Sequence, residues 1–313
     1  MKGIELSEAF YNEYGKAMLQ EGFAHIMDKI AIGICGSGSE CFGYDDEISH
    51  DHDFEPGFCI FLPDESVIDS KTEFQLERAY LKLPKEFKGY KRSVLKPVGG
   101  ARHGVVRISD FLKDKTGTDN GELSLKDWLT IPEQALSEVT NGKLFYDGLG
   151  LMTSARESLA YLPEGVRLKK LAGNLLIMAQ AGQYNYARCV SRRETASAQL
   201  AIFELVKSAL NVIFLLNKRY IPYYKWTFRA LRELPRLSCL DGKLEYLLTT
   251  SNEGDMAREK QNIIESLCAE IIDELRTQGL TDSPSGELED HAYLVNDKIT
   301  DSTLRNLHIL CAI

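Results

Sequence analysis

The chain has 313 residues, of which 44% are hydrophobic and 27% charged, with a formal net charge of −9. This size and balance exclude a disordered or disulfide-dependent chain and predict about two packed domains. Binding to nucleic-acid backbones needs clustered Lys and Arg, so the acidity argues against bulk nucleic acid as a partner. The seven cysteines form no Cys-x-x-Cys pair, which favours reduced thiols in the cytoplasm.

The first half of the chain alternates between helical and extended patterns. Apolar side chains recur at helical spacing over residues 7–29 and again over residues 64–83. Short apolar or β-branched runs predict strands over residues 30–35, 51–62, 103–108 and 144–146. This alternation predicts a small mixed-sheet domain flanked by helices over residues 1–150.

From about residue 152 onward, strand patterns give way to helical periodicity. We expect helices over residues 167–181, 193–216, 226–234, 256–278 and 287–310. The second domain, residues 151–313, is therefore predicted to be an all-α bundle, and the fold class to be α+β. The most apolar stretch, residues 198–216, contains Glu204, Lys207 and Asn211, so we expect a buried helix and no membrane span.

The residues that can carry chemistry gather between the first two predicted strands. The turn Gly36-Ser37-Gly38-Ser39 offers backbone N–H groups and hydroxyls that can hold phosphate oxygens. Asp51 and Asp53 stand two apart in the next predicted strand, which would project both carboxylates from one face, about 7 Å apart. Such a pair suits Mg²⁺ or Mn²⁺, which bind carboxylate and phosphate oxygens together. The pattern predicts a cradle for a metal-bound triphosphate.

These residues also carry a family resemblance. The apolar strand, Gly36-Ser37, thirteen further residues and then Asp51-x-Asp53 resemble the signature of the polymerase β-type nucleotidyltransferase superfamily. Residues 144–150, 182–192 and 222–226 resemble parts of an uncharacterised bacterial family described as nucleotidyltransferase-like, which has a helical C-terminal domain. The likeness extends from residue 30 to about residue 250, and in such proteins the helical domain closes over the acceptor.

The resemblance implies a nucleotidyltransferase that uses a nucleoside triphosphate as co-substrate. Gly36, Ser37 and Ser39 would bind its phosphates, and Asp51 and Asp53 would ligate the metals. An acceptor hydroxyl or amine would attack the α-phosphorus in line, and pyrophosphate would leave. We expect the acceptor to be a small molecule or a protein, and we expect no membrane partner.

Members of the superfamily add a third catalytic carboxylate from a later strand. The predicted strand at residues 103–108 contains no acid, so Asp110 at its end is the first candidate and Asp147, after a different strand, is the second. If neither serves, the alternative is a catalytically impaired nucleotide sensor or a partner-binding module.

Three basic residues of the helical half are further candidates for phosphate binding. Arg188 and Arg192 share one helical face with Asn185 at i, i+3 and i+7 spacing, where guanidinium groups could bind phosphate, although a solvated face is an equal alternative. Lys225 follows the aromatic corner at Tyr223 and Tyr224, and we expect it to lie in a buried apolar neighbourhood with a partner.

Two other polar groups near the aspartates have simpler interpretations. Asp45, Asp46 and Glu47 are expected to form a solvated loop. His50 and His52 alternate with the aspartates and would suit a metal-dependent phosphohydrolase, but that chemistry usually places its His-Asp pairs on helices. The apolar run after Asp53 favours a strand, so this interpretation is the weaker one.

Overall fold

The computed structural model describes residues 1–50, 54–92 and 103–313. These residues form two compact units, each of which is described by itself. Unit 1 comprises residues 1–124 and 131–160, and unit 2 comprises residues 125–130 and 161–313. The sequence boundary at residue 150 differs from this division, because α7 (Leu151–Ser158) belongs to unit 1 and α5 (Leu125–Thr130) to unit 2. The α+β class is confirmed.

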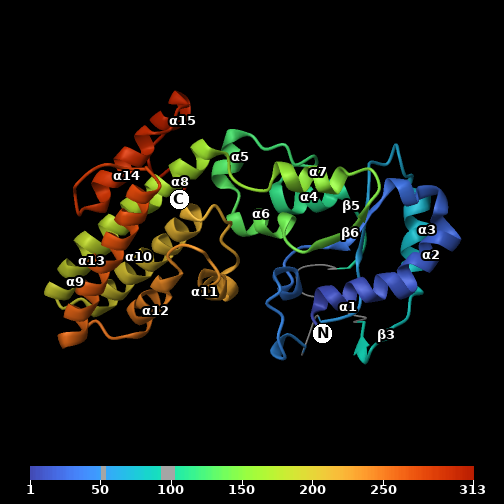
Figure 1. Ribbon diagram of the computed structural model, residues 1–313, viewed down its shortest axis with the longest axis horizontal. Coiled ribbons are helices and arrows are strands. Elements are labelled where there is room, and N and C mark those ends of the chain that lie inside the picture. Colours follow the sequence, from blue (N-terminus) through green and yellow to red (C-terminus); the bar gives the residue numbers. More distant parts are fainter. Residues whose placement is uncertain (51–53, 93–102) are drawn as a thin grey trace. The chain divides into compact units, whose positions relative to one another are not determined.

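Unit 1 contains a four-stranded mixed sheet with the strand order β5-β2-β1-β6 (Figure 1). Its strands are β1 (Ala31–Ile34), β2 (Cys59–Leu62), β5 (Gly104–Arg107) and β6 (Lys143–Asp147). Strand β1 is antiparallel to both neighbours, while β2 and β5 run parallel. A separate hairpin joins β3 (Glu86–Phe87) and β4 (Tyr90–Lys91).

The strand predicted over residues 51–62 is wrong over residues 54–58. The described part of that range becomes extended and paired only at Cys59, two residues after Gly57. Asp51, His52 and Asp53 lie outside the described residues. The expectation that both carboxylates leave one face of a strand therefore stays a prediction.

Helices cover both faces of the sheet in unit 1. They are α1 (Gly3–Phe10), α2 (Lys16–Phe23), α3 (Ser70–Leu81), α4 (Ile108–Thr116), α6 (Glu133–Thr140) and α7. Side chains alternate along each strand, so Ile32 and Ile60 enter a core with α1, α2 and α3. Cys59 and Phe61 face the opposite side, where Met152 of α7 completes a second core.

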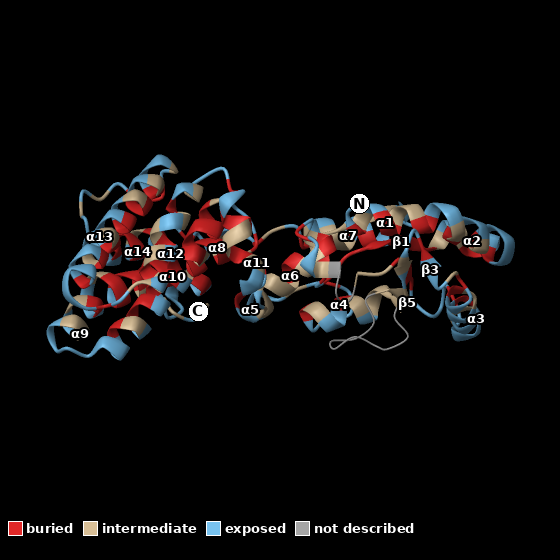
Figure 2. Cartoon of the chain, turned by 90° about the horizontal axis from the view of Figure 1, so that it is seen from below, coloured by how far each residue is buried: buried red, intermediate tan, exposed pale blue. Residues whose placement is uncertain are grey.

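Unit 2 is helical throughout. Its helices are α5, α8 (Glu164–Met178), α9 (Ala187–Ser191), α10 (Thr195–Leu216), α11 (Tyr224–Arg232), α12 (Asp241–Thr249), α13 (Gly254–Thr277), α14 (Leu288–Asp297) and α15 (Ser302–Asn306). Helix α8 packs against both α10 and α14. Buried residues concentrate on α8 and α10 (Figure 2).

Helix α10 has the length and apolar composition of a membrane-spanning helix, and 67% of its most apolar window is buried within unit 2. Its Asn211 Nδ2 donates a hydrogen bond of 3.1 Å to Asn174 Oδ1 on α8. Burial of its apolar side chains against α8 makes α10 a central element of the unit 2 core, as the polar residues in its sequence predicted.

The C-terminal helices are fastened to α8 by a buried lysine. Lys169 Nζ donates to Asn296 Oδ1 at 2.9 Å, to the carbonyl oxygen of Arg305 at 3.1 Å and to that of Leu307 at 2.6 Å. The prediction of one helix over residues 287–310 is wrong. Helix α14 ends at Asp297, and the Asp301 side chain accepts a bond from the Leu304 N–H and so starts α15.

Candidate functional site

The glycine-rich turn after β1 has the backbone conformation that its sequence predicted. Gly36 has φ +128°, a region that residues with a Cβ rarely adopt. The Asn141 side chain holds both polar groups of this glycine: Gly36 N donates to Oδ1 at 3.0 Å, and Nδ2 donates to Gly36 O at 2.8 Å. Sequence reasoning missed Asn141, whose one local signal is the Asn-Gly turn before β6. The geometry makes it the residue that positions the turn.

A cavity of about 300 Å³ opens beside this turn. The turn contributes Gly36, Ser37 and Gly38 to its wall, and α4 contributes Asp110 and Asp114. Ser37 is exposed, whereas Gly36 and Gly38 are buried. The structure therefore brings three sequence-predicted residues, Gly36, Ser37 and Asp110, to one cavity. A wider hollow of about 720 Å³ between α2 and α3 is lined by none of the predicted site residues.

Of the two candidates for a third carboxylate, Asp110 lines the cavity and Asp147 does not. Asp147 pairs with Ala31, at the beginning of β1, whereas Gly36 follows the end of that strand. The carboxylate of Asp147 accepts bonds from Thr153 N at 2.7 Å and Thr153 Oγ1 at 2.8 Å at the start of α7. Asp147 thus orders α7, and Asp110 is the candidate that shares the cavity with Ser37.

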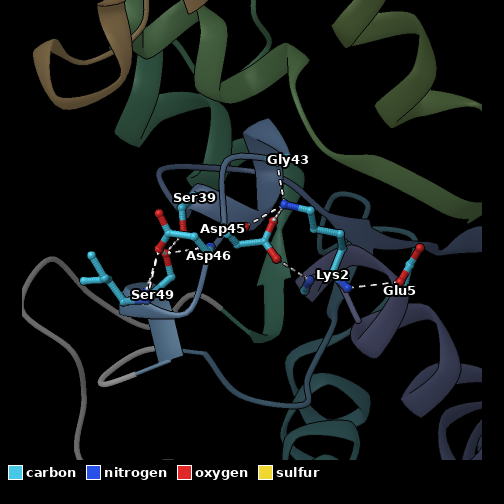
Figure 3. A network of polar contacts seen from close by, with 9 residues as sticks. Lys2, Glu5, Ser39, Gly43, Asp45, Asp46 and Ser49 are labelled. Atoms are coloured by element: carbon cyan, nitrogen blue, oxygen red, sulfur yellow. Dashed lines mark hydrogen bonds and ion pairs between the residues drawn. The ribbon is translucent and has the colours of Figure 1, made fainter. Parts of the chain in front are cut away.

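The loop that follows the turn is tied to the first residues of the chain (Figure 3). The carboxylate of Asp45 accepts a bond of 2.9 Å from Gly3 N and lies 3.6 Å from Lys2 Nζ. Lys2 Nζ also donates to the carbonyl oxygens of Gly43 at 3.1 Å and Asp45 at 2.6 Å. The expectation of a solvated Asp45 is wrong: the residue is only 3% exposed, because these donors replace water around its carboxylate.

The rest of this loop folds around a second aspartate. Asp46 Oδ1 accepts bonds of 3.1 Å from Ile48 N and from both the backbone N–H and the hydroxyl of Ser49 (Figure 3). The hydroxyl of Ser39 lies 3.4 Å from the hydroxyl of Ser49. Ser39, a predicted phosphate ligand, is absent from the residues that line the cavity and packs against the loop instead.

The donor atoms around the cavity suit a hard cation better than a soft one. Burial raises the pKa of the Cys35 thiol to about 12. Burial also raises the pKa of Cys59, with smaller contributions from Cys35 and Glu40, so both thiols stay protonated at neutral pH and are poor metal ligands. Carboxylate oxygens from Glu40, Asp110 and Asp114 remain, which are the ligands that Mg²⁺ prefers. Over the three described ranges, no three acidic, His or Cys side chains converge as a complete metal site.

The single lysine on the cavity wall, among the residues described, is already engaged. Lys115 Nζ lies 3.0 Å from Asp114 Oδ2 and 2.9 Å from Glu138 Oε2. Burial opposes its charge, but hydrogen bonds to these carboxylates outweigh burial and raise its pKa. Lys115 is therefore charged at neutral pH, and its charge is paired with the carboxylates of Asp114 and Glu138.

Arg188 and Arg192 lie one turn apart on α9, whereas Asn185 belongs to the helical segment before it. Residues Ala179–Tyr186 form a π-helix, and α9 ends at Ser191, which makes Arg192 its C-cap residue. A π-helix has more residues per turn than an α-helix, so the predicted spacing from Asn185 fails. Arg188 is exposed, with its guanidinium carbon 4.2 Å from the centre of the Tyr184 ring.

Lys225 lies on the surface of unit 2, so the expectation of a buried lysine is wrong. Helix α11 is amphipathic and turns this side chain outward, 5.0 Å from the centre of the Trp226 ring. Arg192 precedes α10 and Lys225 follows it, and this helix of 22 residues spans about 33 Å. Helices α9 and α11 lie at opposite ends of α10 (Figures 1 and 2). One triphosphate cannot reach both groups.

Comparison with known proteins places one family match on the chain. Residues 128–227 are similar to the model of a family described as a domain of unknown function, DUF4037. The matched range contains Asn141, β6, Arg188 and Arg192, and it covers less than half of the chain. No curated protein matches the sequence.

Proposed function

We propose that the chain is a Mg²⁺-dependent nucleotidyltransferase that transfers a nucleoside monophosphate from a triphosphate to a hydroxyl or amine of a small-molecule or protein acceptor. The observation that carries the proposal is the meeting of Gly36 and Ser37 with Asp110 at one cavity. Asn141 accepts the Gly36 N–H, so the later backbone N–H groups of the turn and the Ser37 hydroxyl would bind phosphate oxygens, and a carboxylate suits a metal or an acceptor proton. Asn141 would keep the turn in its binding conformation.

The proposal assigns a role to each polar group of the site. Asp51 and Asp53 would hold the metal together with Asp110. Bound Mg²⁺ would neutralise the charge that develops on the transferred phosphoryl group. Ser37 would bind a phosphate oxygen of the nucleotide, and Asp110 would accept the proton of the attacking hydroxyl or amine.

A second candidate function is nucleotide binding without catalysis, and strand β5 favours it. This strand carries no carboxylate, and its polar end is committed to structure. Arg107 donates to Pro63 O at 2.9 Å and to Ile68 O at 3.1 Å, and its guanidinium also pairs with Glu73. In this case Ser37 would still bind phosphate, and the chain would act as a sensor or as the partner of another protein.

Calorimetry with triphosphates and Mg²⁺, run beside a screen for pyrophosphate release over a set of acceptors, tests both functions. We expect the wild-type chain to bind nucleotide and release pyrophosphate. Asp53→Asn should abolish release while leaving thermal unfolding unchanged, and Glu47→Gln, at an exposed position six residues earlier in the sequence, should behave like wild type.

Unchanged turnover in Asp53→Asn would overturn the assignment of a transferase. Binding without turnover for every acceptor would favour the sensor, and the lack of any nucleotide binding would remove both functions.

A further inference from the structure

Glu40 is a largely buried carboxylate on the wall of the cavity. It lies in the 3-10 turn Ser39–Phe42, lines the cavity and is only 6% exposed. Within residues 1–50, 54–92 and 103–313, its side chain makes no hydrogen bond and no ion pair. A carboxylate with little exposure needs a partner for its charge, so one without a partner in the described protein is a candidate ligand for a cation.

Two glycines make the room that this carboxylate occupies. A Cβ on Gly38 would overlap the carboxylate atoms of Glu40, and a Cβ on Gly3 would overlap its Cβ. Gly38 itself lines the cavity, so the carboxylate lies against the wall formed by the Gly36-Ser37 turn. Close packing against Gly3 and Gly38 therefore fixes the position of the Glu40 side chain.

The charges around the cavity show what kind of ligand is missing. Glu40 and Asp110 are unpaired in the described part of the chain, while Asp114 shares Lys115 with Glu138. A bare triphosphate entering beside Ser37 would meet two carboxylates and no free cationic side chain from the described wall. Among the described residues of the wall, a cation that bridges phosphate to a carboxylate would supply the positive charge that the phosphate needs.

We infer that Glu40 is a ligand for a divalent cation that enters this cavity with the nucleotide. Mg²⁺ typically takes one or two carboxylates, keeps several waters and completes its shell with substrate phosphates. Glu40 supplies a carboxylate next to the phosphate-binding turn. A divalent cation would bridge this carboxylate and a phosphate oxygen more closely than a monovalent ammonium group. The inference rests on the proposed nucleotide site and adds a residue that the Asp-x-Asp motif does not contain.

Mn²⁺ binding, followed by electron paramagnetic resonance with and without a non-hydrolysable triphosphate, tests the role of Glu40. Glu40→Gln keeps the shape of the side chain and removes its charge. We expect this variant to bind Mn²⁺ in the ternary complex at least tenfold more weakly than wild type. Without metal its melting temperature should be equal to or above that of wild type, because the uncompensated charge is gone. Glu47→Gln is the matched control and should keep wild-type Mn²⁺ affinity.

Every other outcome of this experiment contradicts either the role of Glu40 or the proposed function. Equal Mn²⁺ affinity in wild type and Glu40→Gln, with nucleotide bound by both, overturns the role of Glu40 and leaves the proposed function intact. A lower melting temperature without metal, with unchanged Mn²⁺ affinity, means a structural role only. If wild type binds no nucleotide, the proposed function fails, and Mn²⁺ binding without nucleotide then tests the role of Glu40. A loss of Mn²⁺ binding confined to Glu40→Gln supports Glu40 as a metal ligand. Equal Mn²⁺ binding in both proteins overturns that role.

Discussion

The two hydrogen bonds between the Asn141 side chain and the backbone of Gly36, here called the bracket, give the sharpest quantitative prediction. Asn141→Ala removes two hydrogen bonds, of 3.0 and 2.8 Å, from a buried glycine. A neutral bond of this kind contributes about 0.5–1.5 kcal/mol, so unit 1 should lose about 1–3 kcal/mol of unfolding free energy. If the freed turn must be reordered before phosphate binds, the affinity for a Mg²⁺-bound triphosphate should fall by up to about a hundredfold.

Both tryptophans of the chain lie in unit 2, so their fluorescence would miss this effect. Hydrogen exchange of the β1 amides reports on unit 1 directly, and calorimetry gives the nucleotide affinity. Asn141→Asp keeps the acceptor for Gly36 N–H and loses the donor to Gly36 O, so it should fall between wild type and Asn141→Ala.

Asn120→Ala is the matched control for these variants. It removes one exposed local bond, from Glu122 N to Asn120 Oδ1, and should cost less than about 0.5 kcal/mol. Unchanged β1 exchange in Asn141→Ala would refute the stability argument. Weakened exchange protection with full nucleotide affinity would show that the bracket serves folding only.

Two further predictions concern packing and charge. Gly57→Ala should destabilise unit 1 by about 1–3 kcal/mol, because the new Cβ would lie 2.7 Å from the His103 ring. Gly22→Ala on α2, with open space around it, should be neutral or stabilising. If urea unfolding ranked the two variants in the reverse order of stability, the packing argument would be contradicted. Burial lowers the pKa of Lys260 to about 8, so the unfolded chain binds more protons above that pH and the free energy of unfolding should rise by about 1–3 kcal/mol from pH 7 to pH 10. Lys260→Met should lack this rise, and a pH-independent difference between the two proteins would contradict it.

Local sequence patterns predicted the elements but not the contacts between distant residues. The apolar run at residues 30–35 and the glycine after it were sufficient for β1 and its turn, because burial and positive φ are local demands. Asn141 stands 105 residues from Gly36, and nothing local shows that its amide turns back to that glycine. The sequence assigned no role to Glu40, since its burial depends on space left by Gly3 and Gly38.

Errors arose where helical geometry departed from the regular α-helix or where elements joined without a loop. Helix α4 was missed because it begins at Ile108, directly after β5, with Arg107 as its N-cap. The π-helix before α9 changed the spacing of Asn185 from Arg188, and no composition signal announces such a segment. Lys225 was misplaced because aromatic neighbours suggested burial, whereas α11 turns its basic side toward solvent.

The hold of Lys2 and Gly3 on Asp45 has a practical consequence for protein engineering. An affinity tag or a protease scar that replaces Lys2 would remove the ammonium group beside the buried Asp45 carboxylate, and a side chain at position 3 would collide with Glu40. Recombinant protein altered there could fold and yet show no cation or nucleotide binding. Assays are best made on protein with residues 2 and 3 intact and any tag placed after Ile313.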